Sequence, residues 1–191
     1  MMFKMFTLMA CALLLSGCAS RGEPVSDFSE RSVGYGWLNL KEVDANRLHA
    51  VSVYQHRPQT ATPYWDTAVR KFKDGYLYYS IALTNGAFKT YEATGQSCLG
   101  IICSNTTYTY SFGRQGDEVG AVIIKTPGVY HLGSYDLKDV KTGFFEQGKF
   151  ATAHAKNAPS KRELLEEVLK EVQDNPVMAA RIRQELGKRN D

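Results

Sequence analysis

The sequence predicts a mainly β protein, an antiparallel β-sandwich or partly open barrel of about eight short strands, followed by a C-terminal helical hairpin. Between residues 34 and 158, short runs of β-forming residues alternate with turn residues such as Asp74-Gly75 and Pro127-Gly128. Beyond Pro159 the apolar residues recur with the period of a helix. We therefore expect a sandwich domain over 34–158 and a helical hairpin over 159–191.

The clearest strand is 107–112, where aromatic and hydroxyl side chains alternate strictly. The run 119–124 is apolar on both faces, which favours a central position in a sheet. Residues 57–66 contain two prolines and are expected to form a long loop. Pro127-Gly128 is expected to turn a hairpin into the strand that follows it. The remaining strands are expected at 35–40, 48–56, 67–72, 76–83, 87–93, 129–137 and 144–152.

Two helices are expected at the C-terminal end. Ser160 and Glu163 form a capping-box pattern, and Asn175-Pro176 starts a second helix. Their apolar stripe either packs on the sandwich or on itself, or forms an interaction arm for a partner protein. In the second case the partner-binding residues are Leu164, Val168, Val172 and Ile182.

Residues 1–17 have the composition of an export signal. A short segment with one cation, Lys4, precedes the apolar run 5–15, and small residues follow it. That run is shorter than the roughly 20 residues needed to cross a bilayer as a helix. The polar residues 18–33 have no sustained period and are expected to form a flexible tether.

The residues Leu15-Ser16-Gly17-Cys18 resemble the lipobox of bacterial lipoproteins. The resemblance implies a diacylglycerol on the Cys18 thiol, cleavage before this residue and acylation of the new amine, so that acyl chains hold the protein on a membrane. Ala19 resembles the residue found in lipoproteins sent to the Gram-negative outer membrane, with the domain facing the periplasm. The alternative is an ordinary secreted protein with a coincidental cysteine.

Two cysteines, Cys98 and Cys103, remain for the folded domain once Cys11 is removed and Cys18 is acylated. An even pair in an oxidising compartment favours a disulfide that closes a local excursion of the chain. Metal binding is the rival interpretation, but no histidine or second cysteine pair lies near enough in sequence to complete four ligands. We expect no metal site.

The charge balance gives no indication of a nucleic-acid partner. The 23 basic and 20 acidic residues are mixed along the chain without a basic cluster. Residues 143–150 almost match a phosphate-binding loop, but Phe150 replaces the hydroxyl that would hold magnesium. The chain has neither the HExxH nor the GxSxG pattern. We therefore expect no enzyme activity and no cofactor.

These observations favour a non-catalytic outer-membrane lipoprotein that binds a protein partner or supports an envelope assembly. With its anchor, tether, β-rich domain and helical tail, the chain resembles the small envelope lipoproteins of Gram-negative bacteria. The alternative is a small-ligand-binding or inhibitor module with an aromatic strand face. In that case Tyr108 and Tyr110 bind the ligand, unless their rings are used to pack the sheets.

Overall fold

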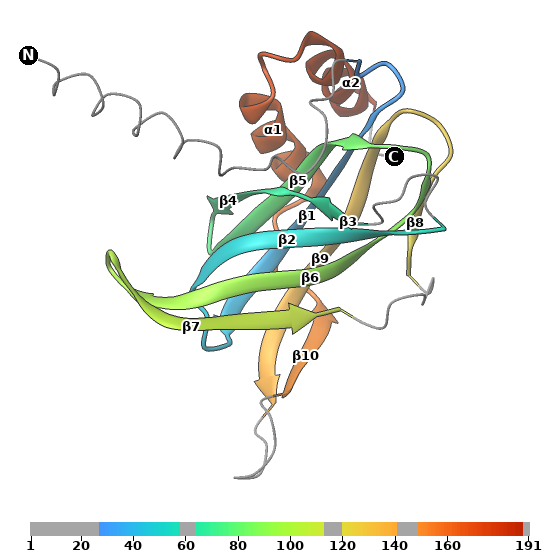
Figure 1. Cartoon of the computed structure of the whole chain (residues 1–191). Coiled ribbons are helices and arrows are strands. Elements are labelled where there is room, and N and C mark those ends of the chain that lie inside the picture. The colour runs from blue at the N-terminus through green and yellow to red at the C-terminus, as the bar shows by residue number, and fades with distance from the viewer. Residues whose placement is uncertain (1–26, 58–63, 113–119, 141–148, 189–191) are drawn as a thin grey trace, which may run out of the picture.

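The computed structural model describes residues 27–57, 64–112, 120–140 and 149–188, which form two β-sheets and two helices (Figure 1). The first sheet has the strand order β10-β9-β1-β5-β4. The second has the order β3-β2-β6-β7, with β8 also paired to β6. The elements are β1 Ser32–Glu42, β2 Arg47–His56, β3 Tyr64–Asp66, β4 Ala68–Phe72, β5 Gly75–Leu83, β6 Gly86–Leu99, β7 Ile102–Ser111, β8 Val122–Ile124, β9 Val129–Val140, β10 Lys149–His154, α1 Lys161–Glu171 and α2 Pro176–Gly187.

The predicted mainly β sandwich with two C-terminal helices is confirmed, with three differences in its strands. β3 lies inside the region expected to be a loop. β1 and β9 pair in parallel, whereas the other strand pairs are antiparallel. β8 has only three residues, and in the described ranges it pairs with β6 alone. Its Ile123 is exposed, so the expectation of a central strand there is wrong.

The expected hairpin at Pro127-Gly128 is also wrong. β8 belongs to the second sheet, whereas β9 pairs with β1 and β10 in the first sheet. The turn therefore carries the chain from one sheet to the other. The chain bends at these residues, but a bend does not determine which strands pair with each other.

The main core lies between the two sheets, and one tyrosine crosses it. Tyr78 of β5 is completely buried, and its hydroxyl lies 2.8 Å from the hydroxyl of Thr90 on β6. It also donates to the Gly133 carbonyl oxygen of β9 at 3.1 Å. Burial raises the pKa of Tyr78 well above its usual value, so the phenol stays a neutral donor. The neighbouring buried side chains include Leu38, Val51, Val53, Leu83, Phe88, Leu132 and Leu137.

The two helices cover the other face of the first sheet and create a second core (Figure 1). Successive side chains of β1 point to opposite faces, so Val33, Tyr35 and Trp37 meet the helices while Leu38 faces the sandwich. The predicted capping box at Ser160 and Glu163 is present. The apolar residues of the helices pack in this second core: Leu164, Leu165, Val168, Val172, Met178 and Ile182.

This packing corrects the interaction-arm interpretation of the helical stripe. Leu164, Val168 and Ile182 are completely buried and Val172 is nearly so. A stripe that looks narrow in sequence is sufficient here because the apolar residues of β1 and β5 complete the contact. These four residues hold the helices on the sheet and are not available to a partner.

The tether is shorter at its C-terminal end than the expected 18–33. Ser32 and Val33 are buried in β1, and Phe28 packs beside the second core. Arg181 of α2 donates hydrogen bonds to the carbonyl oxygens of Ser29, at 3.0 Å, and Arg31. The segment that leads into β1 is thus attached to the last helix.

Candidate functional site

The hairpin formed by β6 and β7 extends beyond the rest of its sheet (Figure 1). Cys98 and Cys103 face each other across it and form a disulfide, as predicted. The expected local excursion is instead a continuation of both strands, with Leu99 paired to Ile102 beyond the disulfide. Gly100 turns the chain with a φ of 63°, a conformation that glycine adopts without steric cost.

Asn46, just before β2, binds β6 on the side away from β7. Its Nδ2 donates to the Cys98 carbonyl oxygen and its Oδ1 accepts from the Cys98 N–H, both at 2.8 Å. The main chain of Asn46 is also fixed, because its carbonyl accepts a 2.8 Å hydrogen bond from the Tyr76 hydroxyl. The base of the hairpin is therefore tied to both sheets.

The tip beyond the disulfide is apolar and exposed. Leu99, Ile101 and Ile102 are 88%, 97% and 74% exposed. Three large aliphatic side chains in one turn form an apolar surface that burial against another molecule would stabilise. The sequence contained a signal for this surface, since Leu-Gly-Ile-Ile occupies a turn where polar residues are usual.

A basic hollow of about 560 Å³ lies at the base of this tip. Arg47, Arg70 and Lys71 line it beside Cys98 and Gly100, and none of the described residues lining it is acidic. Arg70 forms an ion pair with Glu171 at 2.9 Å. Since these cations come from β2 and β4, their approach to the tip could not be seen in the sequence.

Strand β7 is the outer edge of the second sheet. In the described part of the chain it pairs with β6 alone. Its ten residues include neither a charged residue nor a proline. Thr107 and Thr109 are exposed on it. The other edge strands are either shorter or carry charges, as Arg70 and Lys71 do on β4.

The two tyrosines predicted as ligand-binding residues lie on this strand with their rings toward the core. Tyr110 is buried, its ring packs edge-on against Phe150, and its hydroxyl accepts a 3.4 Å hydrogen bond from the Ala45 N–H. Tyr108 is half-buried against the same core. Tyr110 thus joins the sheets, which counts against an aromatic binding face on β7.

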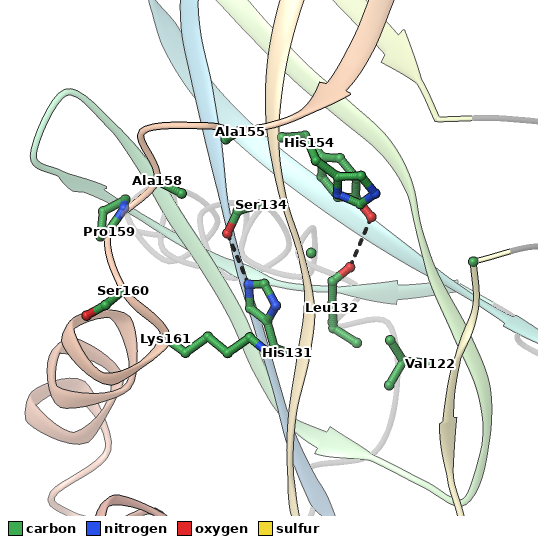
Figure 2. A pocket seen from close by; sticks show the side chains of 13 residues that line it. Val122, His131, Leu132, Ser134, His154, Ala155, Ala158, Pro159, Ser160 and Lys161 are labelled. Atoms are coloured by element: carbon green, nitrogen blue, oxygen red, sulfur yellow. Dashed lines mark hydrogen bonds between the residues drawn. The ribbon is translucent and has the colours of Figure 1, made fainter. Parts of the chain in front are cut away.

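A second candidate is a cavity of about 490 Å³ between β9, β10 and the start of α1 (Figure 2). His131 and Ser134 of β9 point toward one another there, with His131 Nε2 3.0 Å from Ser134 Oγ. Burial, followed by the charges of Lys161 and His154, lowers the pKa of His131 to about 4. The ring is consequently neutral at pH 7.

The His131–Ser134 pair gives little support to nucleophilic catalysis. A histidine that activates a serine must accept its proton, and a pKa of about 4 makes His131 a weak base. Among the described residues that line the cavity there is no carboxylate to orient the imidazole. The pair is better explained as a polar contact satisfied within β9.

The sequence also raises the questions of a lipid anchor, a phosphate-binding loop, a metal site and a membrane-spanning helix. Cys18 and residues 143–148 lie outside the described residues. Where the chain is described, no group of three or more His, Cys, Asp or Glu could hold a metal ion. Within the same residues, neither helix has the length and apolar character needed to cross a membrane.

No known protein family, curated protein or solved structure matches this chain.

Proposed function

We propose that this protein is a non-catalytic lipoprotein of the Gram-negative outer membrane that binds an envelope protein on its periplasmic side. Acyl chains on Cys18 hold it on the membrane, as the lipobox-like residues 15–18 imply. At about 0.8 kcal/mol per buried methylene group, two or three acyl chains make such attachment effectively permanent. The folded domain then works as a tethered binding module.

The observation that carries the protein-binding part is the uncharged edge of β7 over residues 107–111. Edge strands that avoid pairing with other chains usually carry charges, prolines or bulges. The pairing of β7 is irregular between Cys103 and Thr107, but residues 107–111 are paired in regular register and contain neither a charge nor a proline. Its threonines and tyrosines favour the extended conformation. An extended segment of the partner, adding to the sheet as a further strand, fits this edge.

In-cell photocrosslinking tests this assignment. A photoreactive amino acid at Thr107 of β7 is expected to give a discrete adduct with an envelope protein. The matched control position is Thr152 on β10, an exposed threonine at the edge of the other sheet. The Thr109→Lys substitution adds a charge at an exposed site on β7 and is expected to abolish the Thr107 adduct without changing the melting temperature.

Two results would contradict the β7 assignment. One is the same adduct from Thr107 and Thr152, and the other is a Thr107 adduct that persists with Thr109→Lys. The lipid anchor is tested separately by mass spectrometry of the mature N-terminus, which is expected to be an acylated Cys18. A bare Cys18, or processing insensitive to globomycin, would remove the proposed membrane location.

A further inference from the structure

The tip of the β6–β7 hairpin carries three exposed apolar side chains, and positively charged side chains lie where the tip joins the domain. We propose that this tip inserts into an anionic phospholipid membrane. This is a second membrane contact, distinct from the acyl chains proposed on Cys18. Leu99, Ile101 and Ile102 enter the boundary between headgroups and acyl chains, while Arg47 and Lys71 bind lipid phosphates.

The apolar part is prepared for insertion by its surroundings. The Cys98–Cys103 disulfide and the two hydrogen bonds between Asn46 and Cys98 restrict the hairpin just below Leu99. A preorganised tip loses little conformational entropy when it enters another phase. Its outermost residue, Ile101, is 97% exposed, so a membrane can reach it without rearrangement of the domain.

The charges around the tip complement an anionic surface. Arg47 and Lys71 line the hollow beside Gly100, and among the described residues neither forms an ion pair with a carboxylate. Arg47 approaches the hairpin itself, with its Nη1 3.9 Å from Cys103 Sγ. A basic residue close to an anionic bilayer strengthens binding by about fivefold. Aliphatic residues at a tip with cations behind them form the pattern expected at a membrane interface.

The proposed anchor keeps the domain close to its membrane, and this step rests on the proposed function. The nine residues 18–26 separate the acylated end from the described domain and span at most about 30 Å. A domain on so short a tether stays at the surface of the bilayer. The tether leads into β1 at Ser32, whereas the tip lies beyond the opposite end of β1, so the tip reaches the bilayer when the domain lies along its surface (Figure 1). Insertion would then set how the domain is oriented and where the β7 edge faces.

Fluorescence quenching by brominated lipids tests the contact in the full mature protein. The protein is reconstituted in vesicles of phosphatidylethanolamine and phosphatidylglycerol, and Ile101→Trp reports on the tip. The matched control is Ile123→Trp, since Ile123 is an exposed isoleucine on β8, away from the hairpin. With the wild-type emission of Trp37 and Trp65 subtracted, quenching at position 101 is expected to exceed that at 123 about twofold or more.

The charge requirement has its own variants. Arg47→Ser combined with Lys71→Ser is expected to reduce the quenching at position 101, and so is replacement of the vesicles by neutral phosphatidylcholine. Equal quenching in neutral and anionic vesicles would overturn the role given to these two residues. Equal quenching at positions 101 and 123 would overturn insertion of the tip.

Vesicle flotation separates this proposal from the anchor. A protein that floats with the vesicles but shows no quenching at position 101 keeps its anchor and loses the tip contact. Quenching at position 101 in a protein that proves to lack acyl chains would uphold the tip contact alone. A crosslink in cells from position 101 to a protein, without quenching, would assign the tip to that protein and overturn the lipid assignment.

Discussion

The side-chain amide of Asn46 pairs with the main chain of Cys98 in both directions, through two hydrogen bonds of 2.8 Å. Asn46 directly precedes β2, and its main-chain N–H donates to Gln96 of β6 at 3.0 Å. The amide therefore continues the pairing of β6 beyond the end of β2. Cys98 is thus bonded to Asn46 on one side and to Cys103 of β7 on the other. The exposed tip begins directly after this residue.

Removing the Asn46 amide is expected to loosen the hairpin without unfolding the domain. Asn46→Ala loses both hydrogen bonds to Cys98, whereas Asn46→Asp keeps the acceptor for the Cys98 N–H and loses only the donor. Amide hydrogen exchange at Cys98 should accelerate in the alanine variant and stay slower in the aspartate variant. Each lost bond should lower the free energy of unfolding by about 1 kcal/mol. Equal exchange in both variants would show that the amide does not hold the strand.

The disulfide is expected to stabilise the domain modestly, because it closes a short loop. Replacing Cys98 and Cys103 by serine should lower the free energy of unfolding by about 2 kcal/mol in denaturant titrations. Treating the wild-type domain with a reductant should give the same loss, while the double variant should not respond. A reductant effect that persists in the double variant would point to a different origin.

The burial of the helical stripe predicts a large effect from a single charge. Val168→Asp places a carboxylate in the completely buried contact between α1 and the sheet, and should cost at least about 3 kcal/mol of unfolding free energy. The matched control is Val177→Asp in α2, because Val177 is exposed and should change stability by less than about 0.5 kcal/mol. Similar unfolding midpoints for the Val168→Asp and Val177→Asp variants would show that the helical stripe is exposed.

The cavity in Figure 2 predicts an unusual histidine titration. Burial and then the charge of Lys161 keep the pKa of His131 near 4, below its ordinary 6.5. Between these values the unfolded chain binds more protons at this site, so the His131 contribution to stability falls as the pH drops from about 6.5 to about 4. NMR titration of the ring checks the value directly.

A charge variant gives this titration its control. Lys161→Gln removes a cation beside His131 and should raise the pKa of the ring, whereas the exposed Lys156→Gln should not. A His131 pKa near 6.5 in the wild-type protein would contradict the burial that the structure gives this side chain.

Local chemistry explains why much of the fold could be predicted from the sequence. The alternation in 107–112 predicted the second half of β7, and the capping box at Ser160 predicted the start of α1, because both depend on neighbours in the chain. The pairing of Cys98 with Cys103 was also a local matter. Pairing between strands was not: the turn at Pro127-Gly128 looked like a hairpin, yet its two strands belong to different sheets.

By itself, the sequence determined the class of fold, the order of most elements and the disulfide, since each follows from residue types and short spacings. The sequence is also the basis of the proposed anchor at Cys18, which stays a prediction. The tertiary structure decided which surfaces are covered. It buried Val168 and Tyr110, and it exposed Ile101 with Arg47 and Lys71 close to its base. Burial depends on which faces meet across long separations, and a single sequence does not contain that information.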